Sequence, residues 1–304
     1  MPDTVSSPGG VARITPQHQA QWQRDGYLVV PDLLGGDELA RMRQVIAEWV
    51  AGAAAVSTHT DVYDLEPTHS RAEPRVRRIK SPHTLHDAFA AVLRKPDVIA
   101  VLQALLGQAL RLHGSKLNMK SAQFGAPVEW HQDWAFYPHT NDDLLAIGVM
   151  LDDMTAENGP LLVVPGTHTG PVWSHHGSNG RFCGAIDPAG IEAEITRAVM
   201  LTGRAGSMSF HHVRLLHGSA LNTSSRSRNL LLYEVAAADA WPLVNWPGLE
   251  AFDARLLTGA PTITPRLAPV PVRMPYPPAE NQGSIYENQT AAERSYFRRA
   301  AAGD

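Results

Sequence analysis

The sequence contains a single cysteine, Cys183, among 304 residues. One thiol excludes an intramolecular disulfide and a zinc site built from several cysteines, so we expect Cys183 to be a core or loop residue. No uninterrupted apolar run approaches the roughly 20 residues of a membrane-spanning helix, and the first residues have neither the basic patch nor the apolar run of a secretory signal. We therefore expect a cytoplasmic protein that binds no membrane.

The sequence also lacks an excess of charge of one sign. Its 26 Lys and Arg residues against 30 Asp and Glu residues give a formal net charge of −4, which offers no electrostatic attraction for nucleic acid. No Gly-x-Ser-x-Gly segment is present, which argues against a serine hydrolase. With 44% hydrophobic residues, the chain can bury a full core, so we expect a globular protein whose ligand is a small molecule.

The first 108 residues are predicted to be mainly helical. Thr15 followed by Pro16 is typical of a helix start, and Gly26 of a helix end. Apolar residues then recur at helical spacing. The expected elements are a helix over 16–25, a strand over 27–34, a helix over 37–51 and helical structure over 84–106 that is interrupted at Pro96.

Residues 57–84 show no clear periodicity and are expected to be irregular. They contain a cluster of basic side chains, which are Arg71, Arg75, Arg77, Arg78 and Lys80. Two interpretations stay open: a solvated loop, or a clamp for an anionic substrate.

From residue 109 the pattern changes to short apolar or alternating runs bounded by turn residues, which predicts antiparallel strands in a β-sandwich or barrel. Residues 168–200 interrupt these runs without strand or helix periodicity. We expect this segment to make few apolar contacts and, together with a proline-rich arm over 261–278, to act as a lid that orders when substrate binds. The chain then forms one domain, with helical decoration over 1–108, a β core over 109–240, and a C-terminal region over 241–304 that contains the arm over 261–278 and a helix over 290–301.

A metal site is indicated by a His-x-Asp pair. His131 and Asp133 are two residues apart, so on a strand their side chains share one face. Three histidines further along, His211, His212 and His217, offer a third ligand. Two histidines and one carboxylate on one face are the ligand set of many non-haem Fe(II) oxygenases.

Among these histidines, His217 is favoured because Arg228 follows it eleven residues later. In an antiparallel hairpin that arginine returns beside the metal strand. Its planar guanidinium can grip the far end of a dicarboxylate through two parallel hydrogen bonds. Ser219 points the same way as His217 and can donate to the same carboxylate, whereas Arg226 is a surface alternative to Arg228.

With these residues the chain resembles the phytanoyl-CoA dioxygenase family of Fe(II)- and 2-oxoglutarate-dependent oxygenases. The matching segments are HQD at 131–133, NGPLLVVPGTH at 158–168, HGS at 217–219, Arg228 and the opening DGYLVVPDLL at 25–34. The resemblance covers roughly residues 15–240.

The resemblance implies a double-stranded β-helix, also called a jelly roll or cupin-like fold, with iron held by His131, Asp133 and His217. It implies that 2-oxoglutarate binds the iron and is anchored by Arg228 and Ser219, and that O2 is the oxidant. Two further residues match positions that reach toward the co-substrate in relatives, Lys120 and Asn118. Because related halogenases replace the ligand carboxylate with a small residue, the intact Asp133 favours hydroxylation.

The substrate is less defined by the sequence. Trp134, Phe136 and Tyr137 follow the metal residues and either line a substrate pocket or pack in the core. His139, His175 and His176 do not fit the metal triad and are expected in loops or the lid. Members of the family accept acyl-CoA thioesters, amino-acid derivatives, alkaloids and terpenoid or polyketide intermediates, and no CoA-specific motif is present. We expect a specialised metabolite that is hydroxylated, or else desaturated, epoxidised or cyclised, at an unactivated C–H bond.

Two other functions use the same scaffold. A zinc hydrolase or isomerase accepts His, Asp and His with one water, but has no use for Arg228. A catalytically silent binding protein is disfavoured by the intact ligands and arginine. The C-terminal arm matches no family motif, and it either covers the active site or makes a subunit contact.

Overall fold

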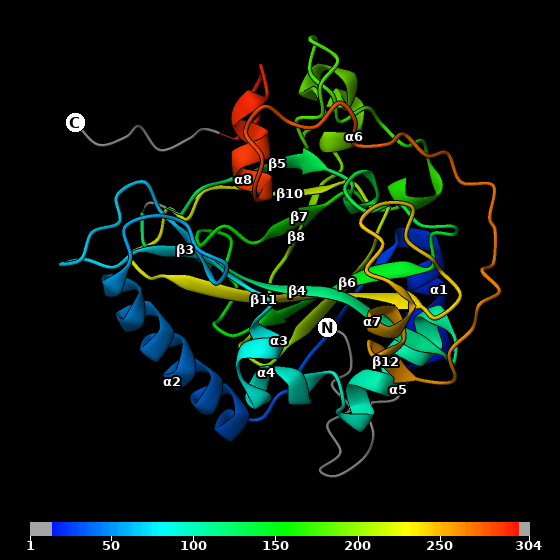
Figure 1. The fold of residues 1–304 in the computed structure, drawn as a ribbon, viewed down its shortest axis with the longest axis horizontal. Helices are drawn as coiled ribbons and strands as arrows, with labels where there is room; N and C mark the ends of the chain where they lie inside the picture. The colour runs from blue at the N-terminus through cyan, green and yellow to red at the C-terminus, as the bar shows by residue number, and fades with distance from the viewer. Residues whose placement is uncertain (1–13, 124, 298–304) are drawn as a thin grey trace.

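Two antiparallel sheets face each other across the molecule (Figure 1). The computed structural model describes residues 14–123 and 125–297. The larger sheet has the order β1 (Tyr27–Val30), β9 (Met208–His212), β6 (Leu144–Met150), β11 (Arg228–Ala237), β4 (Leu110–Lys120), β3 (Val76–Lys80) and β2 (Tyr63–Leu65), with β12 (Leu256–Thr258) paired to β4. The smaller sheet has the order β5 (Val128–His131), β10 (His217–Ser219), β7 (Leu161–Val163) and β8 (Val199–Leu201). This arrangement confirms the predicted jelly roll.

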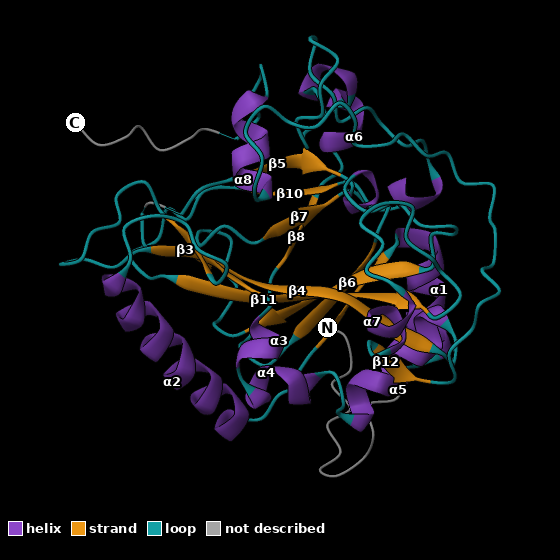
Figure 2. Cartoon of the chain, in the orientation of Figure 1, coloured by secondary structure: helices purple, strands orange, loops and turns teal. Residues whose placement is uncertain are grey.

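Helices cover the outer face of the larger sheet (Figure 2). They are α1 (Pro16–Asp25), α2 (Gly36–Gly52) with the 3₁₀ turn η1 (Ala53–Ala55), α3 (Pro82–Leu85), α4 (Asp87–Val92) and α5 (Pro96–Leu106). The first begins and ends as predicted, because the Thr15 hydroxyl accepts from the His18 amide at 3.3 Å and Gly26 adopts φ +76°. On α2, the residues at helical spacing face the sheet and are buried: Leu39, Met42, Val45 and Ile46.

The strands of the larger sheet divide their side chains between two environments. On β11, Leu231, Tyr233 and Val235 pack against the helices, while the alternate residues face the space between the sheets. This alternation places polar and charged side chains of β4 and β11 in the interior, where the candidate site lies.

The prediction of irregular structure over 57–84 is wrong for β2 and β3. Their basic residues are paired, since Arg78 and Lys80 both contact Asp64, at 2.6 and 3.0 Å. Arg77 pairs with Glu287. The solvated-loop interpretation therefore fails for β3 but holds for the exposed stretch between β2 and β3 that contains Arg71.

The predicted hairpin between the HGS segment and the strand of Arg228 is also wrong. β10 pairs with β5 and β7 in the smaller sheet, whereas β11 lies between β4 and β6 in the larger one. The two strands therefore approach the interior from opposite sheets.

Residues 168–200 are more closely packed than predicted. They contain η3 (Thr167–Thr169, beginning one residue earlier), η4 (Pro188–Gly190), α6 (Glu192–Ile195) and the first residues of β8. Ile186, Ile191 and Ile195 join a buried cluster with Trp130 of β5. The expectation of few apolar contacts is therefore wrong.

The C-terminal region crosses the molecule to reach the smaller sheet (Figure 1). After α7 (Leu249–Asp253) and β12, residues 261–278 contain neither helix nor strand. A helical turn follows earlier than predicted, with α8 (Ile285–Asn288) and η5 (Gln289–Ala291) in place of a helix over 290–301, of which residues 298–301 lie outside the described part. Within the described part of the chain, no helix is both long and apolar enough to cross a bilayer.

Candidate active site

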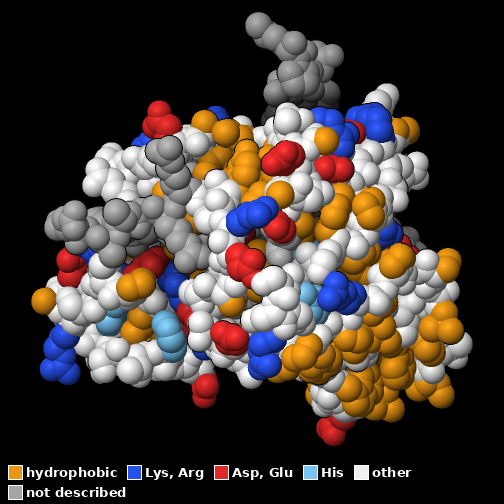
Figure 3. All heavy atoms as spheres, turned by 90° about the horizontal axis from the view of Figure 1, so that it is seen from above, with side chains coloured by type: hydrophobic (Ala, Val, Ile, Leu, Met, Phe, Trp, Pro, Cys, Tyr) orange, Lys and Arg blue, Asp and Glu red, His pale blue; other side chains and the backbone are white. Residues whose placement is uncertain are grey.

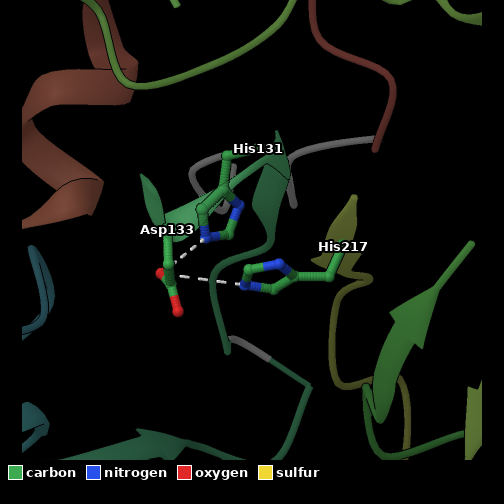
Figure 4. A group of neighbouring side chains, drawn as sticks. All are labelled: His131, Asp133 and His217. Atoms are coloured by element: carbon green, nitrogen blue, oxygen red, sulfur yellow. Dashed lines mark ion pairs between the residues drawn. The ribbon is translucent and has the colours of Figure 1, made fainter. Parts of the chain in front are cut away.

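His131, Asp133 and His217 converge between the sheets (Figure 4). The Nε2 atoms of His131 and His217 lie 3.7 and 3.9 Å from Oδ1 of Asp133. All three side chains are buried, and their ligand atoms lie within 4.8 Å of one another. Asp133 does not share a strand with His131 as predicted, because β5 ends at His131 and Asp133 opens the 3₁₀ turn η2 (Asp133–Ala135). The turn still directs the carboxylate toward both rings.

Backbone carbonyls orient the two imidazoles. Nδ1 of His131 lies 2.8 Å from the carbonyl of Glu129, and Nδ1 of His217 lies 2.9 Å from that of Leu215. A proton on Nδ1 leaves each Nε2 lone pair free, which is the arrangement of metal-binding histidines. Burial, together with the neighbouring His131 ring, lowers the pKa of His217 well below its ordinary value, so its ring is neutral.

The Asp133 carboxylate is charged although it is buried. Desolvation acts to raise its pKa, but the rings of His217, His131 and His211 and the Lys116 ammonium together lower it well below the usual range. Two imidazoles and one carboxylate fit Fe(II), which accepts this set and keeps further positions open.

Gln132 fixes the turn between the two first ligands. Its backbone amide donates to Nε2 of His175 at 2.8 Å, and its side-chain amide donates to the carbonyls of Pro171 and Arg214 and accepts from the Trp173 amide. His175 lies in a loop, one of the two places that we predicted, and there it is a buried positioning residue. Burial lowers its pKa to about 3, so it accepts this hydrogen bond as a neutral ring.

The other candidate histidines take different places. His211 is buried on β9 with Nε2 3.6 Å from Oδ2 of Asp133, and neither ring nitrogen has a hydrogen-bond partner among the described residues. His212 packs against Trp22 and His168 on the other face of the strand. The metal group thus includes His217, as predicted, with His211 beside it.

His139 and His176 lie outside the metal group. His139 is buried against His113, and burial lowers its pKa to about 3. His176 is only partly buried and contacts the carbonyl of Tyr276 at 3.1 Å.

At the other end of the same cavity lie Arg228, Ser219, Lys120 and Asn118. The Lys120 ammonium donates to the Ser219 hydroxyl at 2.9 Å, and Arg228 donates to the carbonyl of Gly159. Gly159 has φ +71°, and a Cβ there would lie 2.6 Å from a neighbouring carbonyl oxygen, so only glycine fits. Arg226, in contrast, is exposed.

This end of the cavity fits a carboxylate. Arg228 is 2% exposed. Among the described residues it forms no ion pair with a carboxylate, and its Nε lacks a hydrogen-bond partner. Burial lowers its pKa to about 10 and that of Lys120 well below the ordinary value. A buried cation without a counter-ion is costly, and a bound carboxylate removes that cost. The residues present therefore fit a dicarboxylate that extends from the metal group to Arg228.

The three aromatic residues after the metal turn differ in their surroundings. Trp134 is in a buried cluster and donates from Nε1 to the Pro271 carbonyl at 2.9 Å, so it anchors the arm instead of lining the cavity. Phe136 packs on His131 and Phe182. Tyr137 also lies near the metal group, since the Asp133 carboxylate adds to burial in raising the pKa of its phenol.

Several cavity residues were missed in the sequence. Lys116 and Glu234 lie on the inward faces of β4 and β11, and Ile285 and Tyr286 come from α8. The period-two alternation from Arg228 would have identified Glu234, which is six residues further along the same strand. Nothing in the local sequence indicates that α8 reaches the cavity.

Comparison with known proteins gives a consistent result. The model of the phytanoyl-CoA dioxygenase family matches residues 22–230. The chain is 36% identical over 284 residues to a probable alpha-ketoglutarate-dependent hypophosphite dioxygenase of Stutzerimonas stutzeri, covering 92% of this chain and 99% of that protein. It is 31% identical to the L-proline trans-4-hydroxylase of Streptomyces griseoviridis, covering 70% of this chain and 83% of that enzyme.

Solved structures agree in fold. EctD from S. alaskensis with 2-oxoglutarate and 5-hydroxyectoine superposes with a TM-score of 0.63 at 27% identity, covering 77% of this chain and 80% of that one. The carbocyclase SnoK from nogalamycin biosynthesis has a TM-score of 0.65 at 22% identity, covering 84% and 96%, and shares the fold.

Proposed function

This chain belongs to the phytanoyl-CoA dioxygenase family and is an Fe(II)- and 2-oxoglutarate-dependent dioxygenase, and on that premise we propose which residues perform the reaction. His131, Asp133 and His217 hold the iron. Arg228 and Ser219 bind the distal carboxylate of 2-oxoglutarate, with Lys120 and Asn118 beside them. The observation that carries this proposal is the buried Arg228, which forms no ion pair within the described part of the chain and lies at the far end of the cavity that holds the three metal-ligand side chains.

When bound, iron and 2-oxoglutarate supply the oxidising chemistry, in which 2-oxoglutarate is converted to succinate and CO2 while O2 oxidises the substrate. The protein positions the reactants for this chemistry. The carbonyls of Glu129 and Leu215 keep both imidazole Nε2 atoms free for the metal. Ile285 and Tyr286 of α8 line the cavity and exclude water from it.

The buried arginine also weighs against the alternatives. A zinc hydrolase or isomerase would not need a second, cationic end to its cavity, and a silent binding protein would not need the metal-ligand set. The Asp133 carboxylate occupies the position that would have to be vacated for a halide, which supports hydroxylation over halogenation.

The substrate is a small molecule, and its identity is narrowed by the relatives. Their names include hypophosphite, L-proline and ectoine as substrates. Hypophosphite carries P–H bonds and no C–H bond. The substrate bond that this enzyme oxidises is therefore either a C–H or a P–H bond. Acidic and basic side chains are interspersed on the face above the smaller sheet (Figure 3), a distribution that favours no polyanionic partner.

A direct experiment measures iron per chain, 2-oxoglutarate binding and succinate formation by the purified protein. We expect one Fe(II) per chain and succinate formation that one of the three named compounds stimulates. A protein that binds zinc in preference to iron and produces no succinate with any substrate would contradict the proposal.

A further inference from the structure

An ion pair outside the proposed iron and 2-oxoglutarate site lies in the same cavity. Nζ of Lys116, on β4, lies 2.9 Å from Oε1 of Glu234, on β11. Their side chains are 26% and 8% exposed, and both line the cavity together with the metal group. Neither residue has a role in holding iron or the co-substrate.

The pair borders the metal group. The Lys116 ammonium is close enough to Asp133 to lower the pKa of that carboxyl. Glu234, like Asp133, is close enough to Tyr137 to raise the pKa of its phenol. Arg228, in contrast, lies six residues from Glu234 along β11, toward the other end of the cavity. The Lys116–Glu234 pair therefore occupies the part of the cavity that 2-oxoglutarate leaves free.

The backbone leaves room for the Glu234 carboxylate. Gly114 of β4 is its partner in the strand register, and a Cβ at that position would lie 3.0 Å from Oε2 of Glu234. A side chain at Gly114 would therefore crowd the Glu234 carboxylate, so glycine at this position leaves the carboxylate its place in the cavity wall.

Structural stability does not explain the pair. Burying two charges costs desolvation, and apolar side chains of similar volume in the same place are often as stable or more so. The inward neighbours on β11 and β6 are apolar, namely Leu230, Leu232 and Ala146. A charged pair kept beside these apolar side chains is typical of ligand recognition.

The charges in the cavity define the ligand further. The net charge is zero for the set made up of Fe(II), the Asp133 carboxylate, the Arg228 guanidinium and a 2-oxoglutarate dianion. Lys120 and the nearby Glu66 have opposite charges when ionised, and burial shifts both toward their neutral forms. What remains is one ammonium and one carboxylate, a dipole without net charge.

We propose that Lys116 and Glu234 form the substrate site and that the substrate is a small zwitterion. Its oxyanion, a carboxylate or a phosphorus oxyanion, binds Lys116, and its cationic nitrogen binds Glu234. This inference rests on the proposed function, because it places the substrate beside the iron. Two substrates named for relatives, L-proline and ectoine, are zwitterions, whereas hypophosphite is an anion alone.

The test uses pairs of probes that differ in one charge. The wild-type protein, loaded with Fe(II) and 2-oxoglutarate without oxygen, is titrated calorimetrically with 2-aminoethylphosphonate against ethylphosphonate, β-alanine against propionate, and with L-proline, ectoine and hypophosphite. Succinate formation is then measured in air with the same compounds. We expect at least one zwitterion to bind at least tenfold more tightly than its analogue or hypophosphite, and to stimulate succinate formation.

Two variants assign the charges. Glu234→Gln keeps the shape of the side chain, and we expect it to lose the tenfold preference for the zwitterion without weakening the anionic analogue. Lys116→Gln should weaken both. Lys95→Gln, which removes an ion pair of 2.6 Å with Glu38 among the outer helices, is the matched control and should leave all affinities unchanged.

The outcomes separate the two proposals. A wild-type protein that binds no iron or 2-oxoglutarate contradicts the proposed function itself. If both bind but no zwitterion exceeds the anions in affinity, or if Glu234→Gln retains the preference while its 2-oxoglutarate affinity shows that it is folded, the zwitterion assignment is wrong.

Discussion

His131 and His217 occupy partner positions in adjacent antiparallel strands, and their ring centroids lie 4.0 Å apart. Residues 86 positions apart in the sequence are thus placed side by side by the pairing of β5 with β10. The carboxylate of Asp133 reaches the same point from the turn that follows β5. The geometry of the metal group therefore depends on one strand register and one turn.

We predict that iron binding distinguishes His217 from His211. Asp133→Ala and His217→Ala should each retain less than about a tenth of the wild-type iron, because each removes one of three ligands. Even the loss of a residue that only hydrogen-bonds to a metal ligand commonly lowers metal affinity by about 10- to 100-fold. His211→Ala should retain it. Iron per chain, measured after dialysis, checks this. Loss of iron in His211→Ala with retention in His217→Ala would show that the other histidine is the ligand.

A second prediction concerns the anchor for 2-oxoglutarate. Arg228→Ala should raise the KM for 2-oxoglutarate strongly, because removing one partner of a buried charge-assisted pair costs roughly 2–5 kcal/mol. Such a loss corresponds to about 30-fold or more. Arg226→Ala, two residues away on the surface, is the control and should leave KM unchanged. Equal effects of the two substitutions would argue against Arg228 as the anchor.

The residues of the metal group were easier to predict from the sequence than the pairing of the strands around them. His131, Asp133 and Arg228 are marked by residue type and spacing, and the fold class follows from short strands without intervening helices. The hairpin argument that favoured His217 was wrong in its topology, because β10 and β11 belong to different sheets. His217 nevertheless lies beside His131 and Asp133, because both sheets of the jelly roll face the same interior.

Long-range contacts were not predictable from local pattern. Nothing in the local sequence distinguishes Lys116 from a solvated lysine on a strand. Its position in the cavity follows only from the place of β4 between β11 and β3. Likewise, the contact of Gln132 with His175 joins segments that are 43 residues apart. Tyr286 reaches the cavity only because the arm crosses the whole molecule, which no periodicity in the sequence indicates.

A third prediction tests the support of the metal turn. His175→Ala removes a buried ring and the acceptor for the Gln132 amide, so we expect the free energy of unfolding to fall by about 2–4 kcal/mol. Iron affinity should fall as well, because Gln132 lies between two ligands. Denaturant unfolding and iron titration measure both. His176→Ala, a partly buried neighbour, should change the free energy by less than about 1 kcal/mol.

A fourth prediction concerns Glu66. Burial raises the pKa of this carboxyl to about 7. Because the folded-state pKa lies above the unfolded value, the folded protein binds the extra proton at low pH, and stability is lost as pH rises toward 7. Glu66→Gln should therefore stabilise the protein lacking ligands by about 3 kcal/mol at pH 8, and by about 1 kcal/mol at pH 5. Unfolding curves at the two pH values check this, and a larger gain at pH 5 would contradict it.

The last prediction concerns how much of residues 168–200 moves. The sequence suggested a lid over the whole segment, but Phe182, Ile186 and Ile195 are buried. The Ile186 amide also donates to the carbonyl of Trp130, beside the metal ligands, at 2.9 Å. Residues 178–180 at the tip, by contrast, are exposed. Opening the buried part would also expose Trp130 of β5, which belongs to the same apolar cluster. The free energy of opening this part must therefore be high.

Hydrogen exchange separates these two parts of the segment. We expect residues 182–195 to be protected before iron or 2-oxoglutarate is added, and residues 177–181 to exchange rapidly. Ligands should then increase protection in residues 285–289, where Ile285 and Tyr286 line the cavity. Rapid exchange throughout 168–200 that slows only on adding ligands would show instead that the whole segment closes as a lid. Protection of 182–195 in the free protein would restrict any gating to α8 and the exposed tip, because the buried part is held against the strand that carries His131.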